Sequence, residues 1–202
     1  MKKVIRIFIS VFVFLNLSML YGQFAHGASW SIDSSHTSVA FKIRHLGVSW
    51  VRGEFRSFNG RVEFDPENVT KTKVSVSIDA KSIDTRNERR DSHLRSPDFF
   101  DVENHPKVEF ASTKIVNIQK ESFDLVGNLK IRGITKKIKI RVSEISSELK
   151  RRGRRSKMGA SGKTKFNRKD FNVSWNRFLD SGGLVLSETV YIYLEIELNK
   201  ME

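Results

Sequence analysis

Apolar and polar residues alternate with a period of two along most of this 202-residue chain. A period of two is typical of β-strands that have one buried face and one wet face. The alternation is clearest over residues 39–43, 74–78, 108–110, 123–131, 138–142 and 192–198. Continuous apolar runs of the parallel-sheet kind do not occur in these segments. The pattern therefore predicts a mainly β fold of roughly eight antiparallel strands, joined mostly by hairpins.

An open sheet of this size would expose unpaired backbone groups at its edges. Closure into a barrel or a tight sandwich hides those edges, and we expect a barrel. Gly53, Gly60 and Gly127 fall on the same face as neighbouring apolar residues and so withhold side chains from the interior. Glycines at such positions mark bends and bulges at barrel corners, or leave space for a ligand, and the sequence leaves both interpretations open.

One segment, Asp84 to Pro106, interrupts the strands and has helical signals. Thr85 and Glu88 have the spacing of a capping box, which predicts a helix start. Pro97 follows a serine, and proline is favoured at the first position of a helix, so a second short helix is expected. Its two aromatic side chains need an apolar surface to cover, and we expect both to face the barrel interior: Phe99 and Phe100.

The first 27 residues have the pattern of a secretory signal peptide. Positively charged residues at the N-terminus are followed by an apolar stretch over 7–20. Ala25 and Gly27 are small residues suited to cleavage before Ala28. The apolar stretch is shorter than the roughly 20 residues of a spanning helix. We therefore expect one exported domain over 28–202, located in the periplasm. It contains no cysteine, so no disulfide contributes to its stability.

The chain is basic, with a formal net charge of +13, and ten Lys and Arg residues lie between Lys150 and Lys169. This segment 150–169 contains several glycines and its first half has no hydrophobic period, which predicts a solvated loop. Such a loop suggests an alternative function, docking on anionic lipid or polymer with the barrel as a scaffold. Export would separate the protein from nucleic acid, so we expect no nucleic-acid partner.

Sequence signals for catalysis are weak. The chain has no nucleophile elbow, P-loop or glycine-rich dinucleotide turn. An enzyme would have to use His36, His93 and Asp91, and we expect no catalysis. Asp91 and His93 point in different directions around a helix, so we also expect no metal site. Two roles stay open here: an ion-pair lock of Arg90 with Asp84, Asp98 or Asp101, or contact of Arg89 or Arg90 with an anionic head group.

Four segments together resemble the YceI-like, polyisoprenoid-binding family of exported bacterial proteins. They cover most of the chain after the signal peptide: Trp30–Asp65, Thr85–Phe110, Gly127–Ile138 and Asn167–Val173. The sequence departs from the family pattern at Asn172, where glycine is usual, and in its strongly basic segment 150–169. The resemblance implies a lipocalin-like antiparallel barrel that holds a lipid without catalysis or a cofactor.

The ligands implied are an isoprenoid quinone, a prenyl phosphate or a similar amphiphilic or fatty lipid, held for transport, storage or stress protection. An apolar interior would bind the tail, although the same residues could simply pack as a core. The candidate tail-binding residues are Phe41, Ile43, Phe55, Phe58, Phe99, Phe100, Phe110, Phe123, Leu125, Leu129, Ile140 and Leu194. The candidate head-group or rim residues are His36, Arg89, Arg90, His93 and Arg168. The oligomeric state stays open, a homodimer included.

Overall fold

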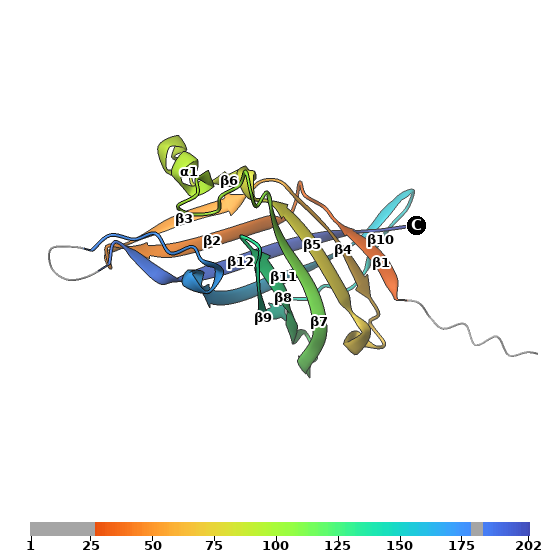
Figure 1. The fold of residues 1–202 in the computed structure, drawn as a ribbon. Helices are drawn as coiled ribbons and strands as arrows, with labels where there is room; N and C mark the ends of the chain where they lie inside the picture. Colours follow the sequence, from red (N-terminus) through yellow and green to blue (C-terminus); the bar gives the residue numbers. More distant parts are fainter. Residues whose placement is uncertain (1–26, 179–183) are drawn as a thin grey trace, which may run out of the picture.

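The computed structural model describes residues 27–178 and 184–202. These residues form a closed antiparallel barrel with one α-helix at one end (Figure 1). The predicted signal peptide lies outside the described residues except for Gly27. The strands are β1 (Ala28–Ile32), β2 (Ser38–His45), β3 (Ser49–Phe55), β4 (Phe58–Phe64), β5 (Lys73–Asp79), β6 (Ile83–Asp84), β7 (Lys107–Gln119), β8 (Ser122–Ile131), β9 (Ile134–Ser143), β10 (Leu149–Arg151), β11 (Arg154–Asn167) and β12 (Leu186–Lys200). The helix is α1 (Glu88–Arg95), and short 3-10 turns span Val69–Lys71, Ala80–Ser82 and Arg168–Phe171.

The barrel closes through the long pairing of β11 with β12, which runs from Lys157 opposite Asn199 to Asn167 opposite Thr189. Around the barrel the order is β11, β9, β8, β7, β5, β4, β1 and β12. Near the helix, three further strands continue the wall after short breaks: β2 continues β1, β3 continues β4, and β6 continues β5. In this part of the barrel β2 pairs with β12 and β3, and β3 pairs with β6. The predicted antiparallel barrel of about eight strands is confirmed.

The prediction of a loop over 150–169 was wrong. Most of this segment is the strand β11, preceded by β10 and a tight turn with Gly153 at a φ of +67°. Inward-facing positions of β11 are occupied by residues such as Ala160, Gly162 and Thr164, which line the interior. Because these inner residues are small or polar, the strand carries almost no hydrophobic period. Lys and Arg side chains at alternate positions of the strand point outward, as expected for the solvated face of a half-buried strand.

The glycines that withhold inward side chains do not leave empty space. A Cβ atom at Gly60 would lie 2.6 Å from Cδ1 of Ile32, and one at Gly127 would lie 2.6 Å from the carbonyl oxygen of Ala111, with the ring of Phe110 also in contact. Each glycine therefore accommodates a neighbouring side chain across the sheet. Gly127 also lies opposite an irregularity in β7 between Ser112 and Lys114, in agreement with the bulge interpretation.

The helical segment differs from its prediction in two details. Asn87, not Thr85, caps α1, because its Oδ1 accepts a hydrogen bond from the backbone N–H of Arg90. The helix ends at Arg95 with Ser96 as its C-cap, and the residues from Pro97 to Asn104 form turns, so the expected second helix is wrong. None of the helices in the described part of the chain has the length and apolar character needed to cross a membrane.

Candidate ligand-binding cavity

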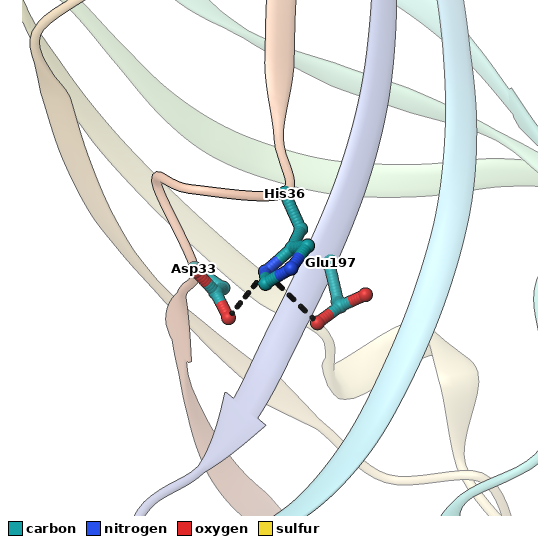
Figure 2. A group of neighbouring side chains, drawn as sticks. All are labelled: Asp33, His36 and Glu197. Atoms are coloured by element: carbon teal, nitrogen blue, oxygen red, sulfur yellow. Dashed lines mark hydrogen bonds and ion pairs between the residues drawn. The ribbon is translucent and has the colours of Figure 1, made fainter.

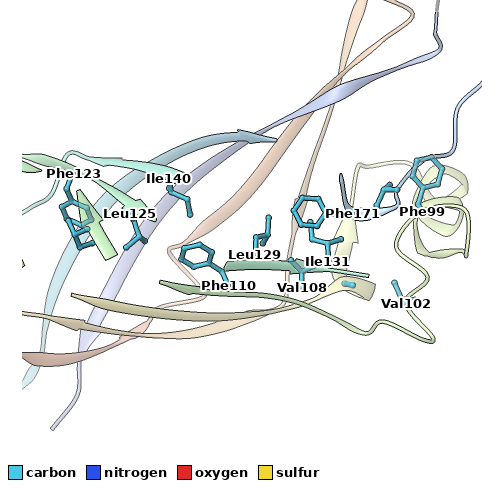
Figure 3. Close-up of a cluster of buried hydrophobic side chains, with 13 residues drawn as sticks. Phe99, Val102, Val108, Phe110, Phe123, Leu125, Leu129, Ile131, Ile140 and Phe171 are labelled. Carbon is cyan, nitrogen blue, oxygen red and sulfur yellow. The ribbon is translucent and has the colours of Figure 1, made fainter. Parts of the chain in front are cut away.

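The barrel encloses a cavity of about 1480 Å³. Its wall is built mainly from the inward-facing aliphatic and aromatic side chains of the strands, several of which Figure 3 shows along one buried cluster. The cavity extends from Val62 and Leu198 in one half of the barrel to His45 and Arg177 beside the helical end. A long apolar space with charged residues near one end suits a molecule that has a long tail and a polar head.

The candidate tail-binding residues lie on this wall with one exception. The structure places these predicted residues along the cavity: Phe41, Ile43, Phe55, Phe99, Phe100, Phe110, Phe123, Leu125, Leu129, Ile140 and Leu194. Phe58 does not line the cavity. It is buried at the start of β4 in a cluster with Val39, Phe55 and Ile83, which separates it from the cavity. The alternation along a strand gives the face of a residue, not the neighbours that cover it.

Basic side chains gather where the cavity opens beside α1. Arg52, Arg86, Arg89 and Arg177 all line this end, and the carboxylates among its lining residues belong to Glu54 and Asp84. Asp84 is already paired with the guanidinium of Arg56. The opening therefore carries an excess of positive charge. It can attract an anionic or strongly hydrogen-bonding group.

The helix is fixed to the barrel by a buried carboxylate. Asp91, 3% exposed, accepts hydrogen bonds from the backbone N–H of Thr85 at 3.0 Å and from its hydroxyl at 2.5 Å. Arg90 donates to the same hydroxyl at 2.7 Å and to the Thr85 carbonyl at 2.8 Å. The predicted ion pair of Arg90 with an aspartate is therefore wrong. Thr85, the residue expected to cap the helix, is instead the point to which the helix is attached.

His93 lies inside an aromatic group next to the opening. Its Nε2 is 2.8 Å from Asp98, and its ring packs edge-on against Phe99 and Trp175, with centroids 5.0 Å apart in both pairs. This group connects α1 with the segment that follows Phe171. Trp175, which sequence reasoning did not select, is part of the cavity wall.

Arg168 lies within the wall rather than at its rim, with 3% of its surface exposed. It donates to the carbonyl oxygens of Ser187, Val173 and Trp175 at 2.7–3.0 Å. Burial lowers the pKa of its guanidinium. Its bonds hold the segment that carries Trp175 against β12. Asn172 in this segment has a φ of +57°, a left-handed conformation that asparagine tolerates in place of glycine.

His36 lies outside the cavity lining, in the break between β1 and β2 (Figure 2). Its Nδ1 is 3.2 Å from Asp33 and 3.6 Å from Glu197. These residues could hold a metal ion by geometry. However, the ammonium of Lys157 contacts both carboxylates, at 2.6 Å from Asp33, and already supplies the positive charge. The hydrogen bond from Lys157 keeps the pKa of Asp33 well below its ordinary range.

The three residues considered for catalysis are not brought together. His36 contacts Asp33 and Glu197 on the outer wall, His93 contacts Asp98, and Asp91 is bound by Thr85. Each therefore has a separate set of structural partners. The cavity, in contrast, is a feature to which many elements of the fold contribute residues.

A closed antiparallel barrel with a long internal apolar cavity defines the class of lipocalin-like binding barrels. Within this class the chain belongs to the YceI-like domain family, whose model matches residues 30–198. A UPF0312 protein of Ectopseudomonas mendocina is 37% identical over 182 residues, covering 89% of this chain and 92% of that protein.

Solved structures agree on the fold. The YCEI protein of Campylobacter jejuni superposes with a TM-score of 0.66 at 32% identity, covering 84% of this chain and 96% of that one. A polyisoprenoid binding domain from Saccharophagus degradans, implicated in plant cell wall breakdown, has a TM-score of 0.62 at 12% identity, covering 86% of this chain and 99% of that domain. At 12% identity the second match concerns the fold alone.

Proposed function

We propose that this protein is a non-catalytic carrier that binds a polyisoprenoid or similar long-chain lipid inside its barrel. The observation that carries the proposal is the cavity of about 1480 Å³, which continues through the barrel and is lined mainly by apolar side chains. A volume near that of roughly 50 water molecules is far larger than a packing defect. Filling it with an apolar chain removes both the chain and the wall from water.

The predicted apolar residues on the cavity wall would contact the tail along its length. Shielding a tail contributes roughly 0.8 kcal/mol per buried methylene, so a long chain binds without special chemistry. The basic opening around Arg52, Arg89 and Arg177 would meet the head group, which suits a prenyl phosphate or a quinone carbonyl. The shared fold supports the same ligand class, because one solved structure with this fold is a polyisoprenoid binding domain.

We place this activity in the periplasm, on the pattern of the first 27 residues. There a carrier would move, store or protect a lipid that cannot diffuse freely through water. No resident cofactor is needed for this role. The bound lipid itself is the molecule on which the protein acts.

Tryptophan fluorescence tests the proposal, because Trp175 lines the cavity and packs against Phe99. Delipidated protein is titrated with prenyl alcohols of ten and twenty carbons and with the corresponding prenyl phosphates. We expect saturable 1:1 binding, and the twenty-carbon tail should bind at least about tenfold more tightly than the ten-carbon tail. Absence of saturable binding, or an affinity independent of tail length, would overturn the carrier function.

A further inference from the structure

Three exposed apolar side chains lie on adjoining loops at one tip of the barrel. Leu46 and Val48, in the hairpin between β2 and β3, are 40% and 78% exposed, and Phe178 is 81% exposed. The two loops that carry them are joined, because the backbone N–H of Leu46 donates to the Val185 carbonyl at 2.8 Å and Phe178 forms a β-bridge with Leu184. Single exposed apolar residues are common, so three on adjoining loops become informative only together with the surface beside them.

The apolar tip adjoins the opening of the cavity. The base of the β2–β3 hairpin lines the cavity through the paired residues His45 and Ser49. The adjoining loop lines it through Arg177 and Val185. A partner that covers the tip would therefore lie beside this end of the cavity.

The outer face of the barrel next to the tip is basic and aromatic. Across β11, β12 and β2, Lys165 lies opposite Tyr191, and Tyr191 lies opposite Lys42. The Lys42 ammonium is 4.6 Å from the centre of the Trp50 ring, which Arg44 also covers at 4.5 Å. Aromatic and basic side chains together are typical of surfaces that lie in the head-group layer of a membrane.

The same face continues across β9, where further lysines line a shallow groove of about 660 Å³. The basic residues of this groove are Lys136, Lys137, Lys139, Arg141, Lys163 and Lys165. Asp124 pairs with Lys139 and Arg141. Among the residues the structure describes, Lys42, Lys163 and Lys165 form no ion pair, and Lys163 lies directly opposite Arg141. Like charges placed opposite each other repel, and an anionic partner would remove the repulsion.

We propose that the protein docks on an anionic lipid bilayer through the tip of Leu46, Val48 and Phe178 and the adjoining basic face. The apolar tip would enter the boundary between head groups and acyl chains, and Lys42, Lys163 and Lys165 would contact lipid phosphates. The apolar tip favours a bilayer over an acidic polymer or a nucleic acid, which offers these side chains no apolar layer. Docking goes beyond lipid carriage and does not require a filled cavity.

Vesicle co-sedimentation at low salt tests the docking surface, with vesicles of pure phosphatidylcholine and of phosphatidylcholine with phosphatidylglycerol at 3:1. Wild-type protein should bind the anionic vesicles at least about tenfold more tightly than the neutral ones. The triple variant Leu46→Ser, Val48→Ser, Phe178→Ser should lose at least about tenfold in affinity. The triple variant Lys42→Gln, Lys163→Gln, Lys165→Gln should lose a similar factor. All six residues lie on the surface or at the barrel's outer face, and circular dichroism verifies folding.

The control is the β10–β11 hairpin, which lies at the other end of the barrel (Figure 1). The variant Arg151→Ser, Arg152→Ser, Arg154→Ser, Arg155→Ser removes four charges there and should bind anionic vesicles within about twofold of wild type. Loss of binding in this variant with retention in both triple variants would overturn the proposal and place docking on the hairpin. Equal binding of wild type to both vesicle types would also overturn it. Prenyl-lipid binding, measured in parallel, reports separately on the carrier function.

Discussion

The ring of Phe41 lies over Gly53, directly opposite it on the neighbouring strand, so that a Cβ atom at position 53 would be 2.5 Å from Cζ of Phe41. The same Cβ would be 2.7 Å from Cγ2 of Thr85, the residue that anchors α1. The glycine thus allows the wall of the cavity and the attachment point of the helix to approach each other closely. Any side chain here must displace one of them.

Gly53→Ala should therefore lower the free energy of unfolding by about 1–3 kcal/mol, since the added methyl group overpacks the wall. Chemical denaturation measures the change. Gly159→Ala is the matched control, because its Cβ would meet nothing nearer than the Ile196 carbonyl oxygen at 3.4 Å. Equal stability of the two variants would contradict this account of Gly53.

Asp91→Ala should detach α1 from the barrel. It leaves the buried N–H of Thr85 without its acceptor, and the expected loss of stability is about 1–3 kcal/mol. Limited proteolysis should cut the segment 84–106 faster in this variant. Ser92→Ala is the control on the same helix, since Ser92 is exposed and its hydroxyl bonds only to Glu88. Unchanged proteolysis in Asp91→Ala would show that the carboxylate does not hold the helix.

The cluster of Asp33 and Lys157 predicts a pH dependence. The folded pKa of Asp33 is depressed, first by the Lys157 hydrogen bond, so its contribution to stability is present above the unfolded pKa of about 4 and is lost as the pH falls below it. Asp33→Asn should lower Tm at pH 7, and the difference from wild type should shrink below pH 4. The exposed Asp170, changed to Asn, is the control with little effect at either pH. A constant difference for Asp33→Asn across this range would exclude the proposed ion pair.

The cavity predicts that a bulky inward side chain blocks ligand uptake. Ala160 lines the cavity on β11, whereas Ala111 is exposed on β7. Ala160→Phe should weaken binding of a twenty-carbon prenyl lipid at least about tenfold, because the ring occupies space that the tail needs. Ala111→Phe makes the same chemical change and should bind like wild type. Fluorescence titration compares them, and equal affinities would mean that the tail does not pass Ala160.

The period of two predicted the antiparallel barrel because most inward positions are large and apolar, as on β12 from Ile192 to Leu198. It failed on β11, where the middle of the inner face carries alanine, glycine and threonine and the outer face carries cations. Periodicity detects a buried face only when its side chains contrast with the exposed face. A strand lining a hollow interior has less need of large inner residues.

The candidate site was predictable in its apolar part and less so in its polar part. The alternation along strands located most cavity-facing residues but misplaced Phe58, because it gives the face of a residue and not the neighbours that bury it. The partners of Arg90 and His36 depend on contacts with Thr85, Asp33 and Glu197 that only the folded chain defines. Long-range side-chain geometry leaves no local signal in the sequence.

The most direct test of the lipid-carrier account is native mass spectrometry of the wild-type protein purified from its own host, followed by extraction of any bound molecule. The account predicts an added mass that corresponds to one long-chain isoprenoid or similar lipid per barrel, reduced or absent in Ala160→Phe and retained in Ala111→Phe. An unliganded mass for wild type, together with no uptake of added prenyl phosphates or isoprenoid quinones, would contradict it.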